Sequence, residues 1–118
     1  MSNFFRQIVP SDIVTATEVY TVHPTNGETI EINTIWITET SGSSTTFGIF
    51  IDTSASELED KIYNEDNALM FEADLEAKQV IIITGDKLIT MSNLKTQLAV
   101  LVGDAGAVTF TFFGERIT

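Results

Sequence analysis

Short apolar runs rich in Val, Ile, Thr and Phe recur along the chain, and clusters of Gly, Ser, Asn and Asp separate them. β-Branched and aromatic residues favour extended backbone, whereas the separating residues favour turns. This spacing predicts an all-β, eight-stranded antiparallel β-sandwich that is jelly-roll-like. The predicted strands are Ile13–Val22, Thr29–Thr40, Thr45–Asp52, Ala68–Asp74, Gln79–Thr84, Lys87–Met91, Gln97–Gly103 and Ala107–Gly114.

The length of 118 residues is enough for one hydrophobic core without disulfides, and the chain has no cysteine. We expect an N-terminal arm at residues 1–12 and a single β-sandwich domain at residues 13–118. Pro10 interrupts the extended pattern, and the apolar residues before it are Phe4, Phe5, Ile8 and Val9. Apolar surface left in water costs about 25 cal/mol per Å². The arm therefore either packs on its own domain or contacts a neighbouring subunit, and the hinge-like sequence after Val9 favours the neighbour.

Three short segments have the composition of tight turns. HPTNGE combines a proline with the Asn26-Gly27 pair, which accepts positive φ, so the chain reverses there. TSGSST contains Gly42 and VGDAGA contains Gly106, and both predict hairpins between their flanking strands. The acidic segment SASELEDKIYNEDN predicts a surface loop, in which Ser56 is placed to cap a short helical turn.

The strand predicted at Thr29–Thr40 contains a change of phase. Ile30 and Ile32 fall on one face, whereas Ile35 and Ile37 fall on the other. Side chains alternate with a period of two along a strand, so a regular strand cannot direct all of them into one core. A bulge near Asn33-Thr34 would reset the register, and cover on both faces is the alternative. The bulge is the favoured interpretation.

The run Val80–Ile83 also has apolar side chains on both faces, which is typical of a strand covered on both sides. In so short a chain, a neighbouring subunit is the natural cover. A Trp within a strand packs more often in a core or interface than against sugars, which makes Trp36 a further candidate. The predicted interface residues are Phe4, Phe5, Ile8, Val9, Trp36, Val80, Ile81, Ile82 and Ile83.

The last predicted strand has a clear apolar face. Val108, Phe110 and Phe112 alternate with Thr109, Thr111 and Phe113, so the two sets point to opposite sides of the sheet. Such a strand has to be paired and covered. We expect Phe110 and Phe112 to form the core with Phe47, Ile49 and Ile51.

The charge balance excludes several classes of partner. Seventeen acidic and six basic residues give a net charge of −11, and no two basic residues are adjacent. Nucleic-acid binding depends on clustered Lys and Arg, so we expect no nucleic-acid partner. No segment has the length and hydropathy of a membrane span or the pattern of a secretion signal. We therefore expect no membrane partner.

The motifs of catalysis and metal binding are missing. His23 is the single histidine, it precedes a proline, and no G-x-S-x-G or nucleotide-binding fingerprint occurs. The acidic residues between Asp52 and Asp66 do not have the spacing of an EF-hand, and a solvated surface is favoured over calcium ligands. Trp36, Tyr20 and Tyr63 are the aromatic candidates for binding a sugar. We expect a protein that is not an enzyme and has no cofactor.

Several turn-and-strand motifs resemble a known family. The second half contains, in order, Leu69, the run Val80–Ile83, Leu98 with Val100, and Thr109-Phe110-Thr111 followed by Gly114-Glu115. The first half, VYTVHPTNGETIEINTIWITETSGSSTTFGIFID, adds a Tyr-Thr-Val opening, a Ser-Gly-Ser turn and a Phe-x-Ile-Phe-Ile-Asp strand. In these motifs the chain is similar to small virion proteins of tailed bacteriophages. It departs from their pattern at His23, inserted between Val22 and Pro24, and at the Asn33-Thr34 irregularity.

The resemblance implies a structural virion protein, most often a capsid decoration (cement) protein that carries no catalytic residues. Such a protein binds the outer capsid surface as a homo-oligomer, which we expect to be a trimer. Its partner would be the major capsid protein, and it would be made in the host cytoplasm. The alternatives are a neck, tail or fibre component, or a carbohydrate-binding module for host attachment.

Overall fold

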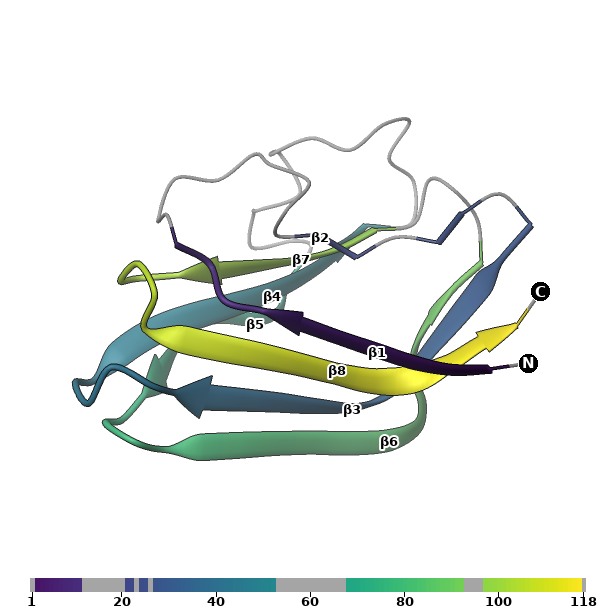
Figure 1. The fold of residues 1–118 in the computed structure, drawn as a ribbon. Coiled ribbons are helices and arrows are strands. Elements are labelled where there is room, and N and C mark those ends of the chain that lie inside the picture. The colour runs from purple at the N-terminus through teal and green to yellow at the C-terminus, as the bar shows by residue number, and fades with distance from the viewer. Residues whose placement is uncertain are drawn as a thin grey trace.

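The computed structural model describes residues 2–11, 21–22, 24–25, 27–52, 68–92 and 97–117. These residues form two four-stranded antiparallel sheets that pack face to face (Figure 1). The first sheet has the order β1 (Ser2–Ile8), β8 (Val108–Ile117), β3 (Thr29–Glu39) and β6 (Val80–Met91). The second has the order β2 (Thr21–Val22), β7 (Gln97–Val102), β4 (Thr45–Asp52) and β5 (Ala68–Leu75). The prediction of an antiparallel β-sandwich is confirmed.

The strands pair from the two ends of the chain inwards. β1 pairs with β8, β2 with β7, β3 with β6 and β4 with β5, and the pairs β3/β8 and β4/β7 complete the sheets. The turns at Gly42 and Gly106 lie where they were predicted, with φ of 87° and 72°. The hairpins predicted there are wrong, because each turn connects strands of different sheets. Turn chemistry sets where the chain reverses, whereas the partner of each strand is set by packing between the sheets.

Two predicted elements have a different form in the structure, and the last strand extends to Ile117. The predicted N-terminal arm forms β1, which pairs with β8 from Ser2 to Ile8. The strands predicted at Gln79–Thr84 and Lys87–Met91 form the single strand β6. Thr84 and Ile89 pair with Thr34 and Ile32, so the residues between them make a large bulge instead of a turn. Most of the strand predicted at Ile13–Val22, and the predicted SASELEDKIYNEDN loop, lie outside the described residues.

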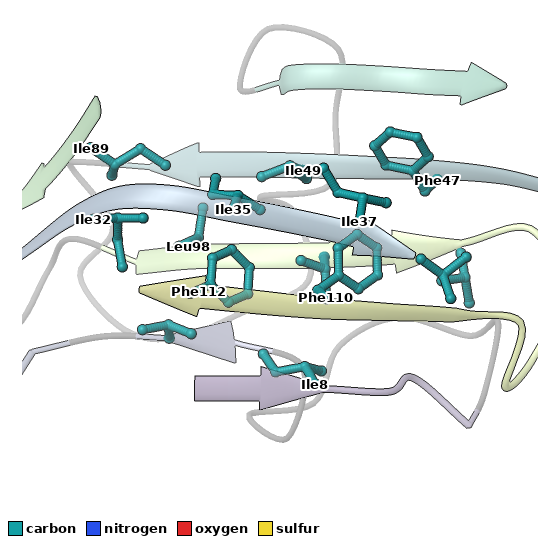
Figure 2. Close-up of a cluster of buried hydrophobic side chains, with 14 of the residues drawn as sticks. Ile8, Ile32, Ile35, Ile37, Phe47, Ile49, Ile89, Leu98, Phe110 and Phe112 are labelled. Carbon is teal, nitrogen blue, oxygen red and sulfur yellow. The ribbon is translucent and has the colours of Figure 1, made fainter. Parts of the chain in front are cut away.

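The predicted bulge in β3 is confirmed. The register shifts between Ile32 and Thr34 in the pairings of β3 with both of its neighbours. As a result Ile32, Ile35 and Ile37 all point into the core, as Figure 2 shows, and each is fully buried. Gly114 of β8 lies opposite the bulge, where a Cβ would overlap a backbone carbonyl oxygen of β3. The glycine therefore allows the two backbones to approach closely.

The core lies between the sheets and has the predicted composition (Figure 2). Phe47, Ile49, Phe110 and Phe112 are at most 2% exposed, and the partly buried Ile51 packs against them. The rings of Phe47 and Phe110 meet edge to face with 6.1 Å between centroids. This core also buries residues from β1, so the N-terminal segment belongs to the sandwich. None of the described residues form a helix long and apolar enough to cross a membrane.

Candidate subunit interface

An apolar patch covers the outer face of the β1-β8-β3-β6 sheet. Strand pairing places Trp36 beside Ile82 of β6 and Phe5 beside Phe113 of β8. Val80 lies two residues along β6 from Ile82, on the same face of the sheet. The side chains of Phe5, Trp36, Val80 and Ile82 are 42–61% exposed. We call Phe5, Trp36, Val80, Ile82 and Phe113 the outer patch.

The aromatic residues of the outer patch form one contiguous cluster. Phe113 is at its centre, with its ring centroid 5.4 Å from that of Phe5 and 4.9 Å from that of Trp36. Both pairs are edge to face, the arrangement that aromatic rings prefer. The cluster therefore joins side chains from β1, β3 and β8 in one surface, although these strands are far apart in the sequence.

Uncharged polar side chains surround most of the outer patch, and Glu115 borders it beside Phe113 and Phe5. Along the central part of this face, the remaining outward positions are Gln7, Thr34, Thr38, Thr84, Thr109 and Thr111. The Gln7 amide Nε2 donates a hydrogen bond to Thr111 Oγ1 at 3.2 Å, so some of these polar side chains are hydrogen-bonded to each other within the sheet. Loss of charge with gain of aromatic residues is the composition of an interface centre. Because the chain has a net charge of −11, a face with so few charged side chains differs from the composition of the chain as a whole.

The outer patch continues to an open edge of its sheet. β6 is the last strand in the order β1-β8-β3-β6, so within the described residues its second edge has no strand partner. The part of β6 from Val80 to Thr84 contains no charge, proline or glycine. Proteins often protect an exposed edge with charged side chains, proline or a bulge, and the bulge of β6 begins only after Thr84. This edge is therefore suited to pairing with another chain.

The predicted interface residues divide into two groups. Phe5, Trp36, Val80 and Ile82 lie together in the outer patch, and the exposed Val9 follows β1. Phe4 and Ile8, each 5% exposed, are instead core residues of their own chain, and Ile81 and Ile83 pack against that core. The cause is the alternation of β1 and β6, which sends neighbouring side chains to opposite faces.

Phe113 belongs to the outer patch but was absent from the predicted interface. The sequence signal was present, because Phe113 alternates with the core residues Phe110 and Phe112 and has to face outward. Its partners could not be read from the sequence, since Phe5 and Trp36 come from strands that neighbour β8 only in the folded sheet.

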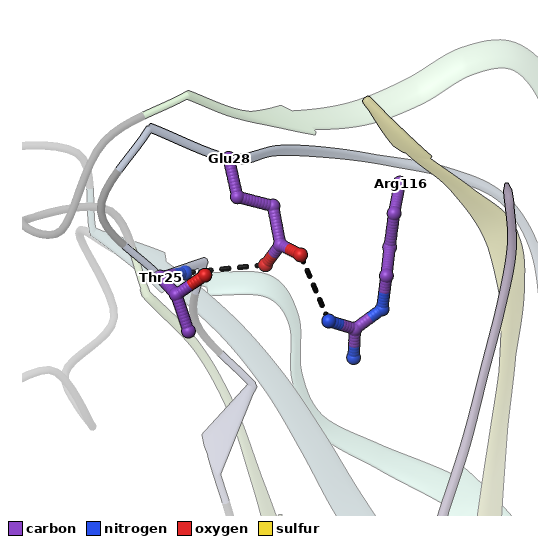
Figure 3. A network of polar contacts seen from close by, with 3 residues as sticks. All are labelled: Thr25, Glu28 and Arg116. Atoms are coloured by element: carbon purple, nitrogen blue, oxygen red, sulfur yellow. Dashed lines mark hydrogen bonds and ion pairs between the residues drawn. The ribbon is translucent and has the colours of Figure 1, made fainter. Parts of the chain in front are cut away.

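A polar cluster holds one end of the same sheet in place (Figure 3). The Glu28 carboxylate accepts a hydrogen bond from the Thr25 amide at 3.1 Å and pairs with Arg116 Nη1 at 2.8 Å. The Thr25 amide, followed by the Arg116 guanidinium, lowers the pKa of Glu28, although burial opposes the shift. Arg116 also lies 5.2 Å from the ring centroid of Phe4. The cluster thus ties β8 and β1 to the turn before β3.

A second buried carboxylate organises the opposite end. Glu39 accepts hydrogen bonds from the Ser41 hydroxyl at 2.5 Å and from the amides of Ser41, Gly42 and Lys78 at 2.8–3.1 Å. The Ser41 hydroxyl is the largest cause of a pKa lowered to about 2. Glu39 therefore stays ionised and joins the β3–β4 turn to the β5–β6 turn. These donors already occupy the carboxylate, so its role is structural.

The described residues give no support to metal chemistry. They contain no group of three or more His, Cys, Asp or Glu side chains placed to hold a metal ion. His23, Tyr20 and Tyr63 lie outside the part of the chain that the structure describes. The outer patch is thus the feature that bears most directly on function.

Comparison with known proteins gives a likeness of fold alone. No protein-family model and no curated protein matches the sequence. Among solved structures, the chain aligns over 100% of its length with 100% of the crystal structure of Drosophila NLP-core, at a TM-score of 0.50 and 12% identity. That structure is described as giving insight into pentamer formation and histone binding. At this identity the match indicates a shared β-sandwich architecture, in agreement with the two sheets described above.

Proposed function

We propose that this chain is a non-enzymatic structural subunit of a bacteriophage virion, most specifically a capsid decoration protein that assembles as a homo-oligomer. The outer patch is the observation that carries the proposal. It provides an uncharged aromatic surface on a chain whose net charge of −11 otherwise makes its copies repel one another. Contact through this face brings copies together while their acidic surfaces stay in solvent.

The size of the outer patch supports self-association. Taking roughly 150–250 Å² for each large side chain, the exposed fractions of Phe5, Trp36, Val80 and Ile82 amount to about 400 Å² of apolar surface. A stable interface buries about 800 Å² per partner, of which somewhat more than half is apolar. The patch therefore supplies about as much apolar area as one partner of such an interface buries, and the surrounding threonines supply its polar rim.

The strand pairing supports the jelly-roll part of the proposal. A jelly roll is formed when a long antiparallel hairpin of eight strands is rolled into two sheets. The pairs β1/β8, β2/β7, β3/β6 and β4/β5 follow that scheme. This arrangement places β1 and β8 side by side in the sheet that carries the outer patch. A trimer remains our proposal for the assembly, and the pentamer named for the NLP-core structure is the first alternative to test.

In the decoration role, each oligomer would bridge several copies of the major capsid protein on the outer surface of the particle. A single contact of this kind can be weak, because contacts made simultaneously by one oligomer add through a high effective concentration. The test is to locate the protein in purified particles by cryo-electron microscopy. Density on the outer shell supports the proposal, whereas density at the neck, tail or fibre, or its absence from particles, contradicts it.

The acidity of the chain favours a second candidate, a carrier of basic proteins. The NLP-core structure is described in terms of histone binding, and a net charge of −11 suits a basic partner. Pull-down of core histones at about 0.15 M salt, near physiological ionic strength, separates the two candidates. Retention of histones with no binding to capsids would favour the carrier over the decoration protein.

A further inference from the structure

The outer face of the second sheet contains a hollow of about 530 Å³ that is separate from the outer patch. Gly48, Phe50 and Leu101 are among the uncharged residues that line it. A Cβ on Gly48 would lie 2.8 Å from Phe50 Cε2, so the glycine leaves room for the Phe50 ring to lie across β4. Phe71 meets Phe50 edge to face at 6.2 Å and remains 42% exposed. The hollow therefore has an aromatic wall that is accessible from solvent.

One wall of the hollow is acidic. Glu72 and Asp74 of β5 line it, both are exposed, and neither pairs with a described cation. Phe71 and Glu72 lie together opposite Gly48, because the register of β4 and β5 shifts between Phe47 and Ile49. The bulge thus presents an aromatic ring and a carboxylate side by side. No Lys or Arg is among the residues that line the hollow.

We propose that this hollow binds an arginine side chain on an extended segment of a partner protein. The guanidinium would stack on the exposed ring of Phe71 and pair with Glu72 and Asp74, and its methylene groups would cover Leu101. A guanidinium is planar, so it can stack on an aromatic ring while it donates paired hydrogen bonds to a carboxylate. A purely apolar segment fits less well, because it would remove two carboxylates from water without a partner.

The site is independent of the outer patch, since the two lie on different sheets. In an oligomer the hollow would be repeated in every subunit, and a partner with several arginine segments would gain affinity from simultaneous binding. The negative charge of the chain would also accelerate the approach of such a partner.

The test is a titration of the isotope-labelled full chain with the blocked peptide acetyl-Gly-Gly-Arg-Gly-Gly-amide, followed by amide NMR spectra at about 0.15 M salt. The matched probe replaces Arg by citrulline, which keeps the shape and removes the charge. We expect saturable shifts confined to Gly48, Phe71–Asp74 and Leu101 with the arginine peptide, and none with the citrulline peptide. Equal shifts with both peptides, or shifts spread over the whole chain, would overturn the proposal.

Variants identify the groups responsible. Glu72→Gln with Asp74→Asn should weaken binding by at least about tenfold, which corresponds to about 1.4 kcal/mol. The control, Glu76→Gln with Asp86→Asn, makes the same change of charge at exposed positions outside the hollow and should change the affinity less than about twofold. Phe71→Leu keeps an apolar side chain but removes the ring. It should weaken binding of the arginine peptide, while the amide spectrum remains that of the folded protein. Equal losses for both double variants would mean non-specific charge attraction and would refute the site.

Discussion

Phe110→Ala removes the ring at the centre of the proposed core. Phe110 has no exposed surface and meets Phe47 at 6.1 Å. A buried Phe removes about 150–200 Å² from water, which at about 25 cal/mol per Å² amounts to about 4–5 kcal/mol. Core Phe→Ala substitutions usually cost roughly 3–5 kcal/mol. We therefore expect the free energy of unfolding to fall by about 4 kcal/mol.

Urea unfolding followed by circular dichroism measures this loss. For a slope of about 2 kcal/mol per M, the midpoint should fall by about 2 M. Phe71→Ala is the matched control, because the same side chain is 42% exposed there and its removal should cost correspondingly less, about 2–3 kcal/mol. A loss below about 1 kcal/mol at Phe110, or equal losses at both positions, would refute the assignment of Phe110 to the core.

Three further substitutions test the polar clusters and the bulge. Glu39→Gln should lower the melting temperature at neutral pH but have little effect near pH 2. The lowered pKa of Glu39 stabilises the fold above the ordinary value of 4.5, and this contribution is lost as the pH falls towards 2. A difference in melting temperature that is equal at all pH values would contradict this. Arg116→Ala should cost about 1 kcal/mol in urea unfolding and less in about 1 M NaCl, because Glu28 loses its cation; a cost that salt does not change argues against the ion pair. Gly114→Ala should abolish folding, as judged by circular dichroism, because the new Cβ would overlap a backbone carbonyl oxygen of β3. In the control Gly85→Ala, the new Cβ meets a side-chain carbon at 3.5 Å, so this variant should fold. A folded Gly114→Ala variant would disprove the close approach.

The fold class and much of the core followed from periodicity in the sequence. The phase change between Ile32 and Ile35 predicted the β3 bulge, because a period of two leaves no other way to bury both residues in one core. Phe110 and Phe112 were predicted in the core for the same reason. These features depend on alternation along one strand, which a sequence records directly.

Features that depend on partners far along the chain were less predictable. β1 was expected to be an arm, because nothing local shows that its partner is the last strand. The Gly42 turn was expected to close a hairpin, since turn residues are similar whether a chain stays in its sheet or crosses to the other. The outer patch was predicted in part, but its central residue Phe113 was missed because its neighbours are known only from the strand order.

Sedimentation velocity of the wild-type chain and two lysine variants is the most direct test of the central claim that the outer patch joins copies of this protein. Ile82→Lys places a charge in the outer patch, and Leu69→Lys places the same charge at a similarly exposed apolar position of the other sheet. We predict that the wild type and Leu69→Lys sediment as the same oligomer, and that Ile82→Lys sediments as a folded 13.0 kDa monomer. A monomeric wild type, or an Ile82→Lys oligomer as stable as the wild type, would contradict the account.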